Sequence, residues 1–440
     1  MDTPILDFIE NYIKSKTSRF HMPGHKGTDF IGCEKFDITE FDGADILYSP
    51  NGIIAKSEDN ATCRFNTLHT FYSAEGSTLA IKAMLALAIQ NANDRPLIFA
   101  GRNAHKAFLH ASVLLDFDIK WLYPEKAESY LSAFISREYL DRELENAEKK
   151  PCAVFITSPD YLGNLADIKG LASVCKKHGV PLLVDNAHGA YLKFLSEDLH
   201  PITLGATACA DSAHKTLPVL TGGAYLHIGF DAPEHFIKSA RNALSLFAST
   251  SPSYLILSSL DKFNAIEDFS EKLKTCIERV GQVKKELIKK GLVIEIGEPL
   301  KIVINANASG YSGVKMASSL QKKGVMVEFY DEEFVVLMPS PYNTEEDFIK
   351  LTKCFSSFTK KPKINNGIAP IKTEVVISPK KAYFANKKEV LLKDALGEIY
   401  GEITFSCPPA VPIVCIGERL NEDAINALKK LGIKKVKIIK

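Results

Sequence analysis

The residues of this 440-residue chain whose types and spacing could do chemistry lie in three short segments. The segments are residues 76–78 (GST), 184–189 (VDNAHG) and 211–216 (DSAHKT). The second and third each follow an apolar run typical of a buried strand, and the first opens a helix-forming stretch. In a doubly wound sheet, residues just past the carboxyl ends of the strands converge on one crevice. We therefore expect five polar side chains to lie together there, those of Asp185, His188, Ser212, His214 and Lys215.

These residue types match what pyridoxal phosphate requires of a protein. Its aldehyde needs a lysine amine for a Schiff base, which Lys215 can supply. Its pyridine nitrogen must stay protonated to act as an electron sink, and Asp185 offers the carboxylate partner. Its phosphate needs backbone N–H groups and hydroxyls, such as those at the helix start at residues 76–78. The ring face needs a flat partner, for which His105 in the segment RNAHKA (102–107) is the candidate.

Each of these residues also has an ordinary structural role. A lysine after a strand is usually a solvated surface charge, an aspartate at a strand end is more often a helix cap, and serine and threonine are common caps. His105 alone is more typical of a surface or core histidine. The combination favours the cofactor, because Asp-x-x-His at 185–188 and Ser-x-His-Lys at 212–215 come at a compatible spacing.

Composition excludes several other classes of protein. His21 and His25 have the spacing of helical metal ligands, but Pro23-Gly24 breaks such a helix and no third ligand is evident, so no metal is expected. The nine cysteines contain no C-x-x-C pair, which favours a reducing compartment over a disulfide framework. A net charge of +1 without a basic stretch gives no reason to expect nucleic acid. With no signal peptide and no apolar run that approaches the length of a membrane span, we expect a cytoplasmic protein.

The chain is long enough for more than one domain. The expected parts are an N-terminal helix and arm, a large cofactor-binding domain, a small α/β domain and a C-terminal domain, over residues 1–30, 31–260, 261–360 and 373–440. In the large domain, apolar strands such as 181–185 and 206–211 alternate with helices, which indicates a largely parallel sheet covered on both faces. One long helical stretch over 255–291 is expected to lead into the small domain, which has a hairpin within 325–340.

The chain resembles the ornithine/lysine/arginine decarboxylase family of prokaryotes, among the fold-type-I pyridoxal-phosphate enzymes, in its short form without an N-terminal wing domain. The matching segments are 20–27 (FHMPGHKG), 76–78 (GST), 102–107 (RNAHKA), 184–190 (VDNAHGA), 212–223 (SAHKTLPVLTGG), 249–261 (STSPSYLILSSLD) and, more loosely, 408–418. The resemblance implies an α/β fold: a large transferase-like domain with a mostly parallel seven-stranded sheet, a smaller α/β domain and a C-terminal α+β domain.

The resemblance also implies a role for each matching residue. Lys215 would form the Schiff base, Asp185 would pair with the pyridine nitrogen, and His105 would stack on the ring. His188 would lie beside the cofactor, and the phosphate would be held by Gly76, Ser77, Thr78, Ser212 and His214. Glu418 is the suggested acidic partner for the distal cation of the substrate, with an ordinary surface glutamate as the alternative.

Two segments imply a homodimer or higher homo-oligomer with shared active sites. One is the arm at His21–Gly27, and the other is a hydroxyl-rich turn that contains Ser249, Thr250 and Ser251. In the resembled family, both lie at the subunit boundary, and the turn reaches the cofactor phosphate of the partner subunit. Taken alone, either segment is most simply a solvated loop.

The sequence departs from the family pattern near the expected site. Glu75 stands where asparagine usually precedes Gly-Ser-Thr, and Asn186 stands where an acidic residue usually follows the strand-end aspartate. The usual Tyr-Pro-Pro-Gly is Cys407-Pro408-Pro409-Ala410, and Leu79-Ala80 replaces a small polar residue. None of these departures removes a cofactor contact, so they bear on the identity of the substrate.

The expected activity is α-decarboxylation of a basic amino acid to its amine and carbon dioxide. Arginine is slightly favoured over lysine and ornithine, because short-form relatives are often assigned to agmatine production. Lys215 or His214 is the expected proton donor to Cα. The alternatives are another fold-type-I reaction such as aminotransfer, a non-enzymatic cofactor-binding relative, and a nucleotide-binding α/β protein, which the absence of a G-x-G-x-x-G or P-loop signature disfavours.

Overall fold

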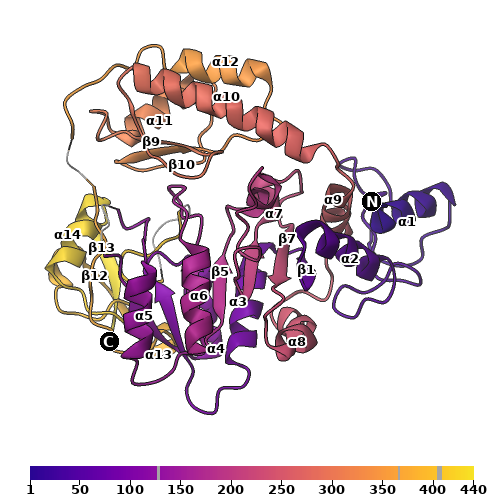
Figure 1. Ribbon diagram of the computed structural model, residues 1–440, viewed down its shortest axis with the longest axis horizontal. Helices are drawn as coiled ribbons and strands as arrows, with labels where there is room; N and C mark the ends of the chain where they lie inside the picture. The colour runs from indigo at the N-terminus through magenta and orange to yellow at the C-terminus, as the bar shows by residue number, and fades with distance from the viewer. Residues whose placement is uncertain (126–128, 365–366, 404–408) are drawn as a thin grey trace. The chain divides into compact units, whose positions relative to one another are not determined.

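A computed structural model of the chain describes residues 1–125, 129–364, 367–403 and 409–440 (Figure 1). The chain forms two compact units. The first comprises Met1–Asp94, Leu144–Ile156 and Ile168–Ser270. The second comprises Arg95–Glu143, Thr157–Asp167 and Glu271–Lys440. The four domain boundaries expected from the sequence remain predictions.

A seven-stranded sheet runs in the order β1-β7-β6-β5-β4-β2-β3. Its strands are β1 His69–Ser73, β2 Leu97–Gly101, β3 Asp118–Leu122, β4 Ala153–Thr157, β5 Leu182–Asp185, β6 Ala208–Asp211 and β7 Ala224–Ile228. The pairs β2/β3 and β5/β6 are parallel, whereas β7 is antiparallel to both of its neighbours, β1 and β6. This confirms the expected α/β class with a mostly parallel seven-stranded sheet.

Helix α3 (Gly76–Ile89) packs on β1, β6 and β7 of this sheet. Its sequence, GSTLAIKAMLALAI, is apolar nearly all round, as a helix buried in a layered α/β fold must be. All residues of β5 and β6 are buried as well, so these strands show no alternation of polar and apolar residues. The polar residues that do occur there stand at the strand ends, Asp185 and Asp211.

The N-terminal helix α1 (Pro4–Lys14) is held by a residue far along the chain. Its preceding residue, Thr3, makes no side-chain cap. Instead, the buried Asp261 carboxylate in α9 (Tyr254–Asn264) accepts hydrogen bonds of 3.0 Å from the backbone N–H groups of Ile5 and Leu6. Its other oxygen accepts one of 2.5 Å from Ser57 in α2 (Ile53–Phe65). A carboxylate at a helix N-terminus satisfies the free N–H groups and the helix dipole together.

The single helical stretch expected over 255–291 is two helices, α9 and α10 (Phe269–Lys289). The physical reason lies in Arg64 at the end of α2. Its guanidinium donates to the carbonyl oxygens of Asn264 (2.9 Å) and Ile266 (2.6 Å), which are thereby satisfied outside a helix. The helical periodicity on either side is correct, but a partner some 200 positions away in the sequence ends the first helix.

The second unit contains two further sheets. The first has the order β10-β11-β9-β8, and the second is the antiparallel pair β12 and β13. The strands are β8 Val293–Ile294, β9 Ile302–Asn305, β10 Phe329–Tyr330, β11 Phe334–Leu337, β12 Lys387–Leu391 and β13 Lys435–Ile439. The expected hairpin within 325–340 is present as β10 and β11.

The remaining helical elements have the following bounds. They are α4 Lys106–Leu115, α5 Arg137–Glu145, α6 Ile168–His178, η1 Ala190–Phe194, α7 Ala213–Thr216, α8 Glu234–Ser245, α11 Gly313–Lys322, α12 Glu345–Cys354, α13 Pro379–Phe384, η2 Leu392–Asp394 and α14 Glu422–Lys430. Among the residues that the structure describes, none of the helices is both long enough and apolar enough to cross a membrane.

Candidate active site

The ends of β5 and β6 bring two of the expected segments together in the first unit. These strands are parallel neighbours with Asp185 opposite Ala210, so 185–189 and 211–216 leave the same edge of the sheet (Figure 1). Lys215 lies on the one-turn helix α7, and its Nζ is 3.1 Å from Nε2 of His188. The Lys215 amine is therefore within hydrogen-bond distance of the His188 imidazole, which lies in the loop after β5.

Asp185 is removed from solvent, with 2% of its surface exposed. Burial raises its pKa from 3.8 to about 6, against the opposing effects of the Lys215 ammonium and of the Ala187 N–H that donates to Oδ1 at 3.2 Å. A buried carboxylate that lacks a full counter-charge is suited to a cationic partner. The protonated pyridine nitrogen expected from the sequence is such a partner.

The start of α3 has the features of an anion site. Its N-cap residue, Glu75, provides no side-chain cap to the first N–H groups of the helix. Gly76 has a φ of +72°, a conformation that favours glycine, and its own N–H donates to the carbonyl oxygen of Gly222 at 2.7 Å. At this helix start the Ser212 hydroxyl donates to that of Ser77 at 2.7 Å. Thr78 is the next residue of the helix.

His214 is oriented by the glycine-rich turn that follows α7. Its Nδ1 donates to the carbonyl oxygen of Gly223 at 3.0 Å, so this nitrogen carries the proton. Burial lowers the pKa of His214, and the neighbouring Lys215 lowers it further. The imidazole is therefore neutral near pH 7, with its one proton already engaged.

The hydroxyl-rich turn lies next to α3 of its own chain. The N–H of Ser249 donates to Oε1 of Glu75 at 2.6 Å, and the N–H of Ser251 donates to the Ser249 hydroxyl at 3.1 Å. The exposed Thr250 stands between them. This contact explains the first departure from the family pattern, because Glu75 holds the turn. Whether the three hydroxyls serve a partner's site remains a prediction.

Asn186, the second departure from the family pattern, also has a hydrogen-bond partner in the first unit. The Asn186 amide donates to Oδ1 of Asp211 at 2.7 Å, and both residues are buried. Asp211 in turn lies within 3.1 Å of His200 and 3.3 Å of His227. The motifs of the sequence suggest no role for these two histidines. Side chains alternate in direction along a strand, so Cys209 and Asp211 face the same side of β6, but this pattern does not point to His200 or His227.

His105 belongs to the second unit. It is the N-cap of α4, and its Nδ1 accepts a hydrogen bond of 3.1 Å from the N–H of Ala107. A ring fixed in this way has a defined orientation, which a stacking role requires. That role remains a prediction.

Glu418 is not a surface residue, since 1% of its surface is exposed. Its Oε2 accepts from Arg102 (3.2 Å), from the Thr373 hydroxyl (2.6 Å) and from the N–H of Cys415 (2.7 Å). Arg102 is also buried and donates to the carbonyl oxygens of Pro412 and Ile413. These contacts give Glu418 a structural role in the second unit. Its expected contact with substrate remains a prediction.

Ala410 occupies a backbone position that suits glycine. Its φ is +55°, in the left-handed region, and its carbonyl oxygen accepts from the N–H of Lys106 at 2.8 Å. The glycine usual in the family would adopt this conformation without strain. Cys407 and Pro408 lie outside the described residues.

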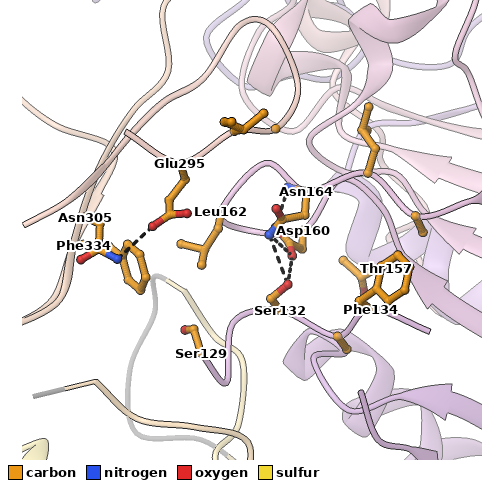
Figure 2. Close-up of a pocket in the computed structure, with 15 residues that line it drawn as sticks. Ser129, Ser132, Phe134, Thr157, Asp160, Leu162, Asn164, Glu295, Asn305 and Phe334 are labelled. Carbon is orange, nitrogen blue, oxygen red and sulfur yellow. Dashed lines mark hydrogen bonds between the residues drawn. The ribbon is translucent and has the colours of Figure 1, made fainter. Parts of the chain in front are cut away.

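A cavity of about 510 Å³ with a mixed polar and apolar lining lies within the second unit (Figure 2). Asp160 projects into it and accepts from the Ser132 hydroxyl (2.6 Å) and the Asn164 amide (2.9 Å), while Glu295 accepts from Asn305 (2.9 Å). Burial raises the pKa of Asp160. No lysine or arginine is among the described residues that line it. None of the site residues expected from the sequence lines it either.

Comparison with known proteins identifies the family. The family described as "Orn/Lys/Arg decarboxylase, major domain" matches residues 3–306. The chain belongs to this family. Two proteins of Bacillus subtilis strain 168, "Uncharacterized protein YaaO" and "Arginine decarboxylase", are each 28% identical to this decarboxylase-family chain over 468 aligned residues. The alignments cover 98% of this chain and 94% and 93% of those proteins.

Solved structures of low sequence identity share the fold. The crystal structure of the Francisella novicida lysine decarboxylase LdcF has a TM-score of 0.84 at 17% identity, over 100% of this family member and 81% of that chain. The structure of the Sphingomonas wittichii serine palmitoyltransferase has a TM-score of 0.57 at 13% identity, over 81% of this family member and 83% of that chain. The family and the fold-type-I architecture expected from the sequence are thus confirmed.

The buried ion pair between Arg102 and Glu418 predicts how a substitution changes the stability of the protein. Replacing Glu418 with Gln should lower the free energy of unfolding by roughly 3 kcal/mol, because the buried Arg102 charge loses its counter-ion. Glu389→Gln is the matched control, since its ion pair with Lys435 is exposed to solvent and its loss should leave the stability nearly unchanged. Urea denaturation of both variants measures the difference. A Glu418→Gln protein of unchanged stability but raised KM would instead assign the carboxylate to the substrate.

Proposed function

We propose that this chain is a pyridoxal-phosphate-dependent decarboxylase of a basic amino acid, with arginine as the favoured substrate. The observation that carries the proposal is the joint presence of Lys215, His188 and the buried Asp185 at two adjacent strand ends, in a member of the Orn/Lys/Arg decarboxylase family. An amine and a buried carboxylate at adjacent strand ends are the two protein groups that the cofactor's chemistry requires.

The residues present fit the cofactor. Asp185 would pair with the pyridine nitrogen, and Lys215 would attach the aldehyde. The uncapped helix start at Gly76, with the paired hydroxyls of Ser77 and Ser212, would hold the phosphate. When bound, pyridoxal phosphate supplies the electron sink that makes loss of the α-carboxylate feasible.

The chain's own residues then divide the remaining work. Asp185 would keep the pyridine nitrogen protonated. Its ionised carboxylate, with 2% of its surface exposed, is poorly screened by water and so attracts that positive charge strongly. Nζ of Lys215 can exchange a proton with Nε2 of His188 at 3.1 Å. Neutral His214 already donates its proton to Gly223, which makes Lys215 the better proton donor to Cα. The overall change is amino acid to amine and carbon dioxide, with one proton taken up at Cα.

Arginine is favoured over lysine because of the extent of the sequence similarity. The relative named arginine decarboxylase aligns with 98% of this chain at 28% identity. The lysine decarboxylase structure, at 17% identity, supports the fold alone. Aminotransfer by the same Lys215 and Asp185 remains the second candidate, since the same fold hosts it. A cytoplasmic location is part of the proposal, because the eight described cysteines are all free thiols.

The direct test is product analysis. Holoenzyme incubated with arginine, lysine and ornithine should release carbon dioxide and the matching amine, fastest from arginine, and little from neutral or acidic amino acids. Lys215→Ala should abolish release, and borohydride treatment of the wild type should leave the cofactor on the peptide that contains Lys215. Transamination of a dicarboxylic acid without carbon dioxide release from any basic amino acid would favour the second candidate.

The raised pKa of Asp185 predicts how cofactor affinity depends on pH. The carboxyl is ionised above about pH 6 and takes up a proton below it, and only the ionised form attracts the pyridinium. Wild-type apoprotein should therefore bind pyridoxal phosphate more tightly than Asp185→Asn near pH 8. This advantage should shrink by up to about tenfold per pH unit below 6. Fluorescence titration of both proteins measures it, and a constant ratio of the two Kd values would mean that another acid contacts the nitrogen.

We also propose that the working unit is at least a homodimer with shared sites. Large apolar side chains are exposed in or beside both segments that the resemblance associates with an interface. They are Phe20 (95%), Met22 (67%), Phe30 (74%) and Ile31 (84%) near the arm, and Leu246 (68%) before the hydroxyl-rich turn. Exposed apolar side chains clustered along one segment are typical of an interaction surface. A two-fold interface would present each turn to the other chain's site.

Complementation tests the sharing. Lys215→Ala and the triple change Ser249→Ala, Thr250→Ala, Ser251→Ala should each be poorly active alone. A mixture of the two after subunit exchange should recover about 25% of wild-type activity, because half the dimers are mixed and each mixed dimer holds one intact site. No recovery despite proven exchange would place the turn in its own chain's site, where Ser249 already contacts Glu75.

A further inference from the structure

Four side chains of metal-ligand type meet in the core of the first unit. Cys209 and Asp211 lie two residues apart on β6 and therefore face the same side of the sheet. His227 on β7 is the register partner of Cys209, and His200 comes from the loop that precedes β6. All four have no exposed surface. The set is too deep for direct contact with solvent and is not used by the proposed reaction.

The donor atoms of His200, Cys209 and Asp211 all lie within 4.8 Å of one another, and His227 adds a ring nitrogen beside Asp211. Oδ2 of Asp211 is 3.1 Å from Nε2 of His200 and 3.3 Å from Nε2 of His227. Sγ of Cys209 is 3.9 Å from Nε2 of His200 and 3.8 Å from the other Asp211 oxygen. Tetrahedral Zn²⁺, with bonds of about 2.0–2.3 Å, separates its nitrogen and oxygen ligands by about 3.3 Å and places sulfur slightly farther away.

Hydrogen bonds alone leave part of this cluster unexplained. Nε2 of His227 lies 3.3 Å from Oδ2 of Asp211, an electrostatic contact whose geometry falls short of a full hydrogen bond. Nδ1 of the same ring is paired with the Thr70 hydroxyl at 2.8 Å. The second oxygen of Asp211 is held by Asn186 at 2.7 Å. Metal-binding histidines and carboxylates have outer partners of this kind, which orient the ligating atom.

We propose that His200, Cys209, Asp211 and His227 bind one Zn²⁺ ion. The charges balance: a thiolate, a carboxylate and two neutral imidazoles neutralise the dication, and the Cys209 proton is released on binding. The ring of Phe65 covers the cluster, with centroids 4.6 Å from His227 and 5.7 Å from His200. A closed set of four protein ligands under an apolar cover is typical of a structural site rather than a catalytic one.

The site would act on the catalytic centre through Asn186. This residue follows Asp185 directly, its N–H donates to the carbonyl oxygen of Ala210 at 3.0 Å, and its amide holds Asp211. An ion bound to Asp211 would therefore fix the segment that carries the pyridine-binding carboxylate. Asn186 is in this respect a positioning residue.

The test is the metal content of the folded protein. Full-length protein produced with zinc in the medium and dialysed against EDTA should retain about one zinc per chain by plasma mass spectrometry, because the ligands are buried. Unfolding in denaturant should release the ion to a chromogenic chelator. X-ray absorption at the zinc edge should find one sulfur at about 2.3 Å and nitrogen or oxygen at about 2.0–2.1 Å.

Variants separate this site from adventitious binding. Cys209→Ser should reduce retained zinc at least tenfold and remove the sulfur scatterer, whereas Cys175→Ser, at a buried cysteine on α6, should retain both. His227→Gln should lose zinc in the same way if Cys209→Ser does not fold. Folded wild-type protein with less than about a tenth of an equivalent of zinc, cobalt or iron would overturn the proposal. So would a zinc content that is the same in wild type, Cys209→Ser and His227→Gln.

Discussion

The buried carboxylate of Asp185, at the end of β5, needs a positive charge to face it, and the residues around it are arranged accordingly. Asp185 has 2% of its surface exposed, and its pKa of about 6 means that the folded chain holds its charge only near neutral pH and above. Such a charge is costly unless a cation faces it. The Lys215 ammonium meets part of that need, and a protonated heterocycle would meet the rest. The ends of β5 and β6 thus place a buried carboxylate close enough to the Lys215 ammonium to feel its charge.

The sheet explains why the sequence reveals so much of this site. Parallel strands end at one edge, so a polar residue that follows a fully apolar run must lie at that edge. β5 and β6 are apolar except for their last residues, and the motifs at 185–188 and 212–215 begin there. The start of α3 is predictable for another reason, because Gly-Ser-Thr opens a helix-forming stretch. Local pattern and topology agree at these positions, which is why the α/β class could be predicted from the residues, whereas the family was recognised from the resemblance of its motifs.

Contacts between distant residues could not be predicted in this way. The break between α9 and α10 depends on Arg64, and the anchoring of α1 depends on Asp261, more than 250 positions away. Glu418 has the appearance of a surface residue in the sequence, because nothing near it indicates that Arg102 will be buried against it. Propensity and periodicity describe a residue's neighbours along the chain, whereas these side chains are paired by the tertiary fold.

The departures from the family pattern are linked by charge. An acidic residue at 186 would stand beside Asp211, and two buried carboxylates at the 2.7 Å that separates Asn186 from Asp211 would repel strongly. The amide at 186 removes that repulsion and donates a hydrogen bond instead. One negative charge therefore remains near Asp185. It belongs to Asp211 on β6, not to the loop after β5, and His200 and His227 lie beside it. Glu75 follows the same logic, since its carboxylate would oppose a phosphate at the start of α3 but accepts from the Ser249 N–H instead. These two departures are thus each compensated by a contact that would suit the proposed site to a cationic ring and an anionic phosphate.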